Sequence, residues 1–414
     1  MKICVVSTSD SKGGAAVIAQ RLVRGLRKRQ YDVTFLVRQQ DGEQSESTSI
    51  ACPQQNSLYH KLRSRIEHRR GLNAIGSIHQ FPKFNNSVDW SDFDIVHFHD
   101  INRLNLNHLP WLAQQTKLIW TIHSMSPFTG NCVFSFDCDR WKSTCGECPQ
   151  FGKWPLKWLH RDASDQVLAR KKNIYRKTAM TLIGVSEWLS ARVRESVMGA
   201  LPTNTIQNAL DETKFKPVEK ILAKKKMGIE AGAKTIAFSV ASNPEDTRKG
   251  IDIILDAIPR LRHEITFLPM AIGANTDELA KVIGSQNRMM QPVHLATVEQ
   301  LRDYYSAADL VWHPSRADTS SLVSMEAMAC GTPVVAAEVG GVPEVVGRDS
   351  PYSTGVLIPP DDPEALARET DLLFDSPDLL AKMSVNSRRR VESLFGLDRF
   401  LDQHLETYES ALTG

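Results

Sequence analysis

Two carboxylates lie eight positions apart in the segment ADTSSLVSMEAMACGTPVV, residues 317–335: Asp318 and Glu326. The surrounding sequence predicts a strand, a loop, a helix and a second strand, with Asp318 in the loop and Glu326 inside the helix. The rest of that helix is mainly apolar, and an acid there costs free energy unless it is solvated or hydrogen-bonded. The vicinal hydroxyls of a ribose would supply such partners, and a glutamate on the helix surface explains the pattern equally well.

The start of this helix and a basic turn upstream are both suited to an anion. A helix exposes free backbone N–H groups in its first turn. Here that turn holds Ser320, Ser321 and Leu322. The turn TRKG, residues 247–250, opens another predicted helix, where cations oppose the helix dipole unless an anion is bound. Arg248 and Lys249 would neutralise a diphosphate there, and a solvated basic loop is the alternative interpretation.

Glycines and histidines mark the ends of predicted strands in the first half of the chain. Gly13 and Gly14 separate the first strand from the first helix, where backbone amides can approach an anionic or sugar ligand; tight packing would need the same glycines. His123 ends a predicted buried strand, and ligands of open α/β sheets bind at the carboxyl ends of the strands. We therefore expect a site role for His123 and a core role for His97 on the neighbouring strand.

Four of the seven cysteines fall within residues 131–150: Cys132, Cys138, Cys145 and Cys148. Their closing C-x-x-C spacing, in a polar segment typical of a loop, favours a structural zinc site with four thiolate ligands. Such a site leaves the metal no open position for catalysis. A disulfide pair is the first alternative, and unlinked core cysteines are the least favoured interpretation because the segment is polar.

The order of elements predicts an α/β protein of two wound halves. Strands alternate with helices, as in the βαβ units of a parallel sheet, and a lysine-rich stretch at 211–234 separates the halves. Strands are expected at residues 2–10, 31–37, 93–99, 117–123, 180–186, 235–242, 265–273, 293–297, 309–315, 333–338 and 355–360. We expect a Rossmann-like domain at 1–205, a second at 206–396, and a helix near 397–414 that returns to the first. A ligand cleft would lie between the two facing domains.

Composition restricts the class of protein. The 414 residues are 42% hydrophobic and 24% charged, which is typical of a soluble globular protein of about two domains. A net charge of +2 argues against a dedicated nucleic-acid binder. No apolar run reaches the roughly 18 residues of a membrane span, and the first residues lack the pattern of a signal peptide, so we expect a cytoplasmic protein.

The motifs occur in an order that resembles a known family. They are the Gly-Gly turn, the strand-end His123, VSEWL (185–189), NALD (208–211), RKG (248–250), YSAADLVWHPS (305–315), the two acids with EAMACGTPVVA (326–336), GGVPEVV (340–346) and GVLIPPDD (355–362). Together they are similar to the motifs of the family-4 retaining glycosyltransferases with the GT-B fold. Within that family the pattern most resembles the transferases of exopolysaccharide, capsule (colanic-acid type) or lipopolysaccharide assembly that carry a cysteine cluster.

The resemblance implies roles for residues of the second half. Glu326 would hold the nucleotide ribose, and Lys249 the diphosphate. Asp318 would bind hydroxyls of the transferred sugar, aided by the backbone amides at 319–322. The first acid is Asp here where the family usually has Glu, which would alter sugar preference.

In the first half, the resemblance implies that His123 contacts the sugar near the reacting carbon and that Gly14 lets the diphosphate approach. The arginine that the family usually carries five residues before the lysine falls at Pro244. Arg248 would take its place.

The expected reaction moves a sugar from a nucleotide-diphosphate donor, UDP- or GDP-linked, with retained anomeric configuration. The resemblance implies that no cofactor is required for catalysis, because positive groups take the place of a metal. The acceptor would be a glycan or a polyprenyl-linked saccharide of surface polysaccharide biosynthesis. The aromatic and basic segment 151–177 suggests peripheral contact with an anionic membrane, and a plain amphipathic helix is the alternative. A sugar-nucleotide epimerase of the same architecture and a non-catalytic sugar-nucleotide-binding protein are the alternative functions.

Overall fold

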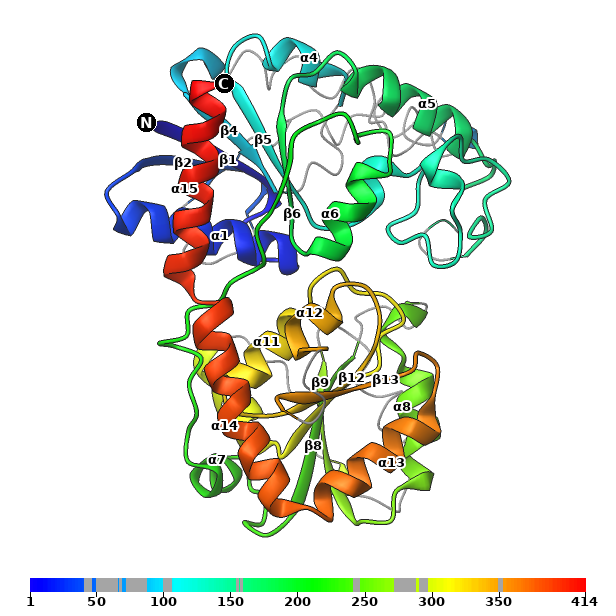
Figure 1. Ribbon diagram of the computed structural model, residues 1–414, viewed down its shortest axis with the longest axis vertical. Helices are drawn as coiled ribbons and strands as arrows, with labels where there is room; N and C mark the ends of the chain where they lie inside the picture. Colours follow the sequence, from blue (N-terminus) through cyan, green and yellow to red (C-terminus); the bar gives the residue numbers. More distant parts are fainter. Residues whose placement is uncertain are drawn as a thin grey trace. The chain divides into compact units, whose positions relative to one another are not determined.

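The computed structural model describes most of the chain, namely residues 1–40, 47–49, 66, 69–71, 88–99, 106–153, 156, 159–240, 246–271, 288–289, 297–348 and 353–414. The described residues form two compact units. Unit 1 comprises Met1–Asn208 and Phe400–Gly414, and unit 2 comprises Ala209–Arg399. Each unit is built around one parallel sheet with helices packed against it (Figure 1).

The described strands of unit 1 form a seven-stranded parallel sheet in the order β3-β2-β1-β4-β5-β6-β7. They are β1 (Lys2–Ser9), β2 (Asp32–Gln39), β3 (Thr48–Ser49), β4 (Ile95–Phe98), β5 (Lys117–Ile122), β6 (Thr181–Gly184) and β7 (Thr203–Thr205). The central strands β1, β4 and β5 are almost wholly buried, as expected for parallel strands with both faces covered. The edge strands β3 and β7 are short and polar, which is why the sequence pattern did not predict them.

The helices within the described part of unit 1 are α1 (Gly14–Lys28), α4 (Leu109–Leu112), α5 (Ser164–Tyr175), α6 (Glu187–Arg194) and α15 (Leu397–Thr413), the last of which belongs to unit 1 from Phe400 onward. α15 crosses α1 (Figure 1). A Cβ atom at Gly25 of α1 would lie 2.7 Å from Leu401 of α15, so glycine permits this close approach. An ion pair between Arg29 and Asp402 joins the same two helices.

The described strands of unit 2 form a six-stranded parallel sheet in the order β10-β9-β8-β11-β12-β13. They are β8 (Lys234–Val240), β9 (Ile265–Ala271), β10 (Arg288–Met289), β11 (Leu310–His313), β12 (Val334–Ala337) and β13 (Gly355–Ile358). The helices described in this unit are α7 (Lys220–Lys226), α8 (Ile251–Ala257), α10 (Val298–Ala307), α11 (Leu322–Ala329), α12 (Val342–Val346), α13 (Pro363–Phe374) and α14 (Pro377–Leu394). The strand predicted at 293–297 lies almost entirely outside the described residues.

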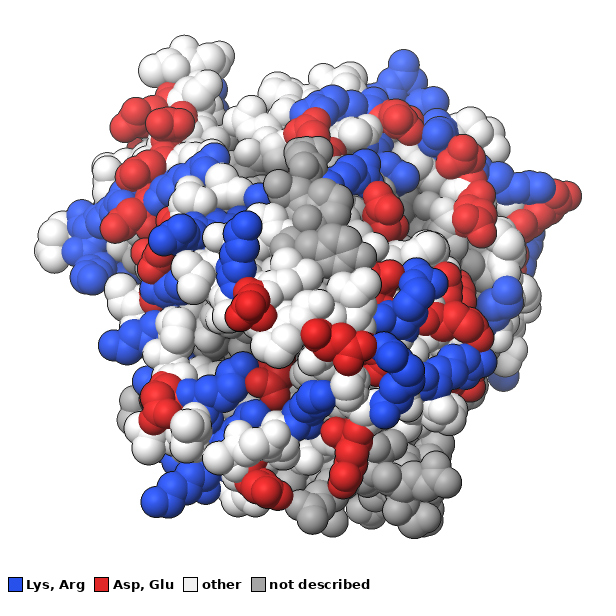
Figure 2. All heavy atoms as spheres, turned by 60° about the horizontal axis from the view of Figure 1, so that its bottom comes forward, with Lys and Arg blue, Asp and Glu red and all other residues white. Residues whose placement is uncertain are grey.

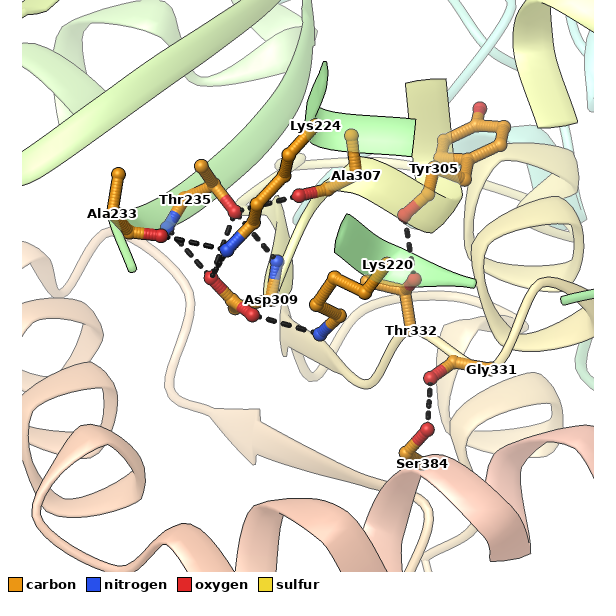
Figure 3. Close-up of polar contacts among 10 residues, drawn as sticks. All are labelled: Lys220, Lys224, Ala233, Thr235, Tyr305, Ala307, Asp309, Gly331, Thr332 and Ser384. Carbon is orange, nitrogen blue, oxygen red and sulfur yellow. Dashed lines mark hydrogen bonds and ion pairs between the residues drawn. The ribbon is translucent and has the colours of Figure 1, made fainter. Parts of the chain in front are cut away.

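A partly buried ionic network joins strands at the amino-terminal edge of this sheet (Figure 3). Asp309, which precedes β11, accepts hydrogen bonds from Lys220 at 2.7 Å and from Lys224 at 3.0 Å. It also accepts a 2.9 Å bond from the backbone N–H of Thr235, at the start of β8. The two central strands are thereby held in register at the edge opposite to their carboxyl ends.

No helix in the described ranges is both long and apolar enough to span a membrane. On the face drawn in Figure 2, acidic and basic side chains lie interspersed, in keeping with the small net charge.

Candidate active site

Both sheets change direction of winding at their centre. In unit 1 the connection reverses between β1 and β4, and in unit 2 between β8 and β11. Open α/β sheets bind ligands outside the carboxyl ends of the strands at such a switch point. The predicted residues Lys249 and Asp318 lie in loops that follow β8 and β11, at the switch point of unit 2.

In unit 2 the Asp318 carboxylate lies among positive and donor groups, in the loop between β11 and α11. Its Oδ2 atom is 3.3 Å from Nε2 of His313 and 3.7 Å from Nζ of Lys249, and Oδ1 accepts a 3.1 Å hydrogen bond from the backbone N–H of Ser320. Burial raises the pKa of Asp318, but Lys249 and His313 outweigh burial and hold that pKa well below its ordinary value. Asp318 is therefore ionised at neutral pH.

Lys249 comes from the loop that follows β8. Lys249 is the last residue of a 3₁₀ turn, η7 (Thr247–Lys249). Gly250, with a φ of 66°, separates this turn from α8. Lys249 therefore precedes α8 and does not lie in its first turn as predicted. A Cβ atom at Gly250 would lie 2.2 Å from the carbonyl oxygen of Pro314, so the loops after β8 and β11 approach each other closely at this glycine.

Two arginines shape the same loop. The guanidinium of Arg248 donates two hydrogen bonds, of 2.7 and 2.6 Å, to the carboxylate of Asp246, so its charge is matched within the loop. Arg316, in the loop after β11, donates its backbone N–H to the carbonyl of Arg248 at 2.7 Å and its side chain to Thr247 and Asp252. Arg316 thereby fixes the position of the turn that presents Lys249.

α11 supplies the third part of this site. Ser321 caps the helix, with its Oγ accepting a 3.1 Å bond from the N–H of Ser324. The neighbouring Ser320 hydroxyl is buried and has no hydrogen-bond partner among the described residues. The first turn of α11, from Leu322, therefore begins beside Asp318 with a buried hydroxyl available to a ligand.

Glu326 is buried in α11, with 9% of its surface exposed. Its Oε2 atom lies 3.5 Å from the hydroxyl of Tyr305. The alternative of a surface glutamate is therefore wrong.

The turn that follows α11 and the loop that precedes it are both fixed by contacts of motif residues. Thr332 donates to the carbonyl of Tyr305 at 2.7 Å, and Ser384 donates to the carbonyl of Gly331 (Figure 3). At the other end, Gly340 has a φ of 57° and a Cβ atom there would lie 1.8 Å from the carbonyl oxygen of Asp318. A glycine at 340 is thus required for the position of the Asp318 loop.

In unit 1 the predicted residues lie at the ends of β1 and β5. Gly14 is the first residue of α1, and Gly13 caps it with a φ of 92°. His123 follows β5, and its Nε2 atom lies 3.1 Å from Nδ1 of His99, at the end of β4. His97 is fully buried and bonded at both nitrogens, as a core histidine should be.

The cysteine cluster is a packed group of free thiols. Burial raises the pKa of Cys132 to about 12 and that of Cys145 to about 11, and it also raises the pKa of Cys148. The six cysteines within the described residues, Cys138 included, are free. Across those same residues no three His, Cys, Asp or Glu side chains are placed to share a metal ion, so the structure does not support the predicted zinc site.

The segment predicted to contact a membrane is only partly described. Trp154 and Trp158 lie outside the described residues. Lys171, one of its cations, is internal: its ammonium donates to the carbonyls of Ser126 at 2.6 Å and Thr129 at 2.8 Å. Lys171 therefore cannot serve the predicted membrane contact.

Two residues with a clear place in these sites were not predicted: His313 and Arg316. His313 could have been found by the argument used for His123, because it also ends a buried strand. The contacts of Arg316 depend on two loops that meet across β8 and β11, and no spacing in the sequence reveals them.

Comparisons with known proteins agree with this geometry. A family described as "Glycosyltransferase Family 4" matches residues 12–214, and one described as "Glycosyl transferases group 1" matches residues 234–376. The chain belongs to the family-4 glycosyltransferases. The predicted α/β fold of GT-B type and the predicted enzyme class are confirmed, and in this class catalysis needs no cofactor.

Curated proteins are similar to this chain over part of its length. "D-inositol 3-phosphate glycosyltransferase 1" of Catenulispora acidiphila is 32% identical over 238 residues, which cover 53% of this chain and 54% of that protein. The chain thus spans about half the length of the curated relatives it matches first. The relative's name refers to inositol phosphate, so it gives no support to the predicted link with surface polysaccharide.

Solved structures share the fold at low sequence identity. A sucrose-phosphate synthase of Thermosynechococcus elongatus has a TM-score of 0.69 and 21% identity, with both chains covered completely. HepE of Anabaena, solved in complex with UDP-glucose, has a TM-score of 0.68 and 18% identity, covering 99% of this chain and 100% of that one.

Proposed function

We propose that the protein is a retaining glycosyltransferase that moves a sugar from a UDP- or GDP-linked donor to a hydroxyl-bearing acceptor. Unit 2 would bind the donor: Glu326 the ribose, Lys249 and the start of α11 the diphosphate, and Asp318 the sugar hydroxyls. Unit 1 would bind the acceptor, with His123 near the reacting carbon and Gly14 close to the diphosphate.

The observation that carries the proposal is the grouping of Asp318, Lys249, His313 and the α11 start at the switch point of the unit 2 sheet. An ionised carboxylate there is a charge-assisted acceptor for hydroxyls. An ammonium 3.7 Å away offers positive charge to an anion, and the buried Ser320 hydroxyl offers one more polar contact. A sugar joined to a diphosphate presents this pair of chemistries side by side.

Transition-state electrostatics explain how such a site would act. When the bond between the sugar and the diphosphate breaks, negative charge grows on the leaving phosphate oxygens. Lys249 and the amides at the start of α11 would stabilise the phosphate charge more strongly in the transition state than in the ground state. This difference accelerates the step. The acceptor hydroxyl would attack from the face that the diphosphate leaves and would pass its proton to the departing phosphate oxygen, so the anomeric configuration is retained. Arg248, whose charge is matched by Asp246, would contribute less than Lys249.

Two acceptor classes have support. The cluster of motifs resembles transferases that use glycans or polyprenyl-linked saccharides. The curated relative is named for D-inositol 3-phosphate, which favours a small phosphorylated polyol. Peripheral attachment at an anionic membrane would accompany the first class only.

The test is a panel of UDP-, GDP- and CMP-sugars, each incubated with the protein and with either class of acceptor. We expect one UDP- or GDP-sugar to yield a glycosylated acceptor that retains the donor's anomeric configuration, determined by NMR of the product. Epimerised sugar nucleotide without acceptor would contradict the proposal in favour of the epimerase. Tight donor binding without turnover on any acceptor would favour the non-catalytic binding protein.

A further inference from the structure

Four histidines lie together in unit 1, between the sheet and α15. Ring centroids are 4.5 Å apart for His97 and His99, 5.3 Å for His99 and His123, and 5.6 Å for His97 and His404. Burial lowers the pKa of all four, to about 3 for His123 and about 4 for His404, so each is neutral at pH 7. A neutral imidazole carries one N–H and one lone pair, and its partners determine which nitrogen has the hydrogen.

The other two histidines make their hydrogen bonds to different partners. Nδ1 of His404 lies 2.8 Å from the carbonyl oxygen of Phe400 in the same helix, which only accepts, so His404 carries its hydrogen on Nδ1. Both nitrogens of His97 face hydroxyls, Tyr408 of α15 at 2.7 Å and Thr121 of β5 at 2.8 Å. His97 thereby joins α15 to the sheet, and neither histidine is hydrogen-bonded to His99 or His123 in these contacts.

The pair of His99 and His123 has two possible arrangements. Nδ1 of His99 lies 3.1 Å from Nε2 of His123, so one ring donates and the other accepts. If His123 donated, His99 would carry its hydrogen on Nε2, a buried atom without a partner among the described residues. If His99 donates from Nδ1, its Nε2 atom carries a lone pair and no hydrogen.

The second arrangement is favoured because buried donors without partners are rarer than buried acceptors without partners. When His99 donates from Nδ1, its buried Nε2 atom, which has no partner among the described residues, carries a lone pair and no hydrogen.

We propose that His99 is a positioning residue that donates its Nδ1 hydrogen to His123 and so places the hydrogen of His123 on Nδ1. His123 then acts as a neutral, oriented hydrogen-bond donor and not as a cation. This assignment rests on the proposed function at one point: the atom that accepts the Nδ1 hydrogen of His123 is taken to be an oxygen of the sugar.

The experiment observes the tautomer directly. The full chain is labelled with ring-¹⁵N histidine, and long-range ¹H–¹⁵N spectra are recorded at pH 7.5, with His123 assigned by the loss of its signals in His123→Asn. We expect Nδ1 of His123 to be protonated and Nε2 to be bare. His99→Phe should abolish this pattern, and His99→Asn should restore it, because the amide nitrogen of asparagine occupies nearly the place of Nδ1. Protonation of His123 on Nε2 in the wild-type protein would overturn the proposal, as would an unchanged tautomer in His99→Phe.

Activity provides the second readout. Once a donor and an acceptor are known, His99→Phe should lower kcat about tenfold with an unchanged KM for the donor, and His99→Asn should recover most of kcat. If His99→Phe does not fold, the wild-type and His99→Asn spectra still decide. If no sugar nucleotide is turned over, the proposed function fails, and the spectra report on His99 and His123 independently.

Discussion

The carboxylate of Asp318 and the ammonium of Lys249 lie 3.7 Å apart, although 69 residues separate them in the chain (318 − 249). Their meeting requires the loops after β8 and β11 to approach each other, which Gly250 and Arg316 make possible. The pair joins a group suited to hydroxyls with a group suited to phosphate. This relationship leads to predictions that separate sugar recognition from phosphate recognition.

Asp318→Asn should weaken recognition of the sugar without weakening recognition of the nucleotide. Asparagine keeps an acceptor for the Ser320 N–H but loses the charge, and bonds to a charged group exceed neutral ones by about 1 kcal/mol. We expect kcat/KM for the donor to fall roughly tenfold. Titration with UDP and GDP, which carry no sugar, provides the control. Their affinity should not fall, because Lys249 loses a competing carboxylate, and an equal loss for nucleotide and sugar nucleotide would contradict the assigned role.

Gly250→Ala should disturb the phosphate side of the site. The residue has a φ of 66°, and its added Cβ atom would meet the Pro314 carbonyl at 2.2 Å, so the loop must move. We expect donor affinity to fall and the free energy of unfolding to fall by about 1 kcal/mol or more. Gly232→Ala is a matched control, because nothing lies within 4 Å of a Cβ atom there. Equal donor affinity in the two variants would show that the position of this loop does not matter.

The histidine cluster should make unit 1 sensitive to acid. Its members have folded-state pKa values below the ordinary 6.5, so the unfolded chain binds more protons between pH 6.5 and about 4. Their contribution to stability is therefore complete above about pH 6.5 and declines as the pH falls, by about 1.4 kcal/mol per pH unit for each histidine. Calorimetric melting between pH 7.5 and 5 should show this decline. The slope should be smaller in His99→Phe, and a slope that does not change would contradict the explanation.

Asp309→Ala should destabilise unit 2 strongly. Lys224 is buried with 3% exposed, and Asp309 is its charge partner (Figure 3). Removing one member of a buried pair costs about 3–5 kcal/mol. Urea unfolding measures the loss, and Asp303→Ala is the control because its partner Lys226 is exposed, where such pairs contribute about 0–1 kcal/mol. Similar losses in the two variants would contradict a special role for the Asp309 network.

The sequence predicts the fold well where burial determines the pattern. Parallel strands covered on both faces, such as β1, β8 and β11, are continuous apolar runs, and these were predicted. The strands β3 and β10 have two residues each, too few for an apolar pattern to show in the sequence. The 3₁₀ turn before α8 was predicted as part of the helix, because the φ of 66° at Gly250 is a property of the folded loop.

The residues of the candidate site also differ in whether the sequence predicts their role. Glu326 could be predicted because an acid within an apolar helix is unusual by itself. The matching of Arg248 by Asp246 could not, since two residues of one loop can point apart or together. The pairing of His99 with His123 depends on the ends of β4 and β5 lying side by side, which requires the strand order.

The central claim is that unit 2 holds a nucleotide-diphosphate sugar through Lys249 and Glu326. Isothermal titration of the wild-type protein with the UDP- and GDP-sugar panel tests it most directly, alongside Lys249→Ala, Glu326→Ala and the surface control Lys225→Ala. We expect one sugar nucleotide to bind, with affinity about 10- to 100-fold lower in Lys249→Ala and in Glu326→Ala, since each loses charge-assisted bonds of about 1.5–3 kcal/mol, and unchanged in Lys225→Ala. Failure of every sugar nucleotide to bind, or equal affinity in all four proteins, would contradict the account.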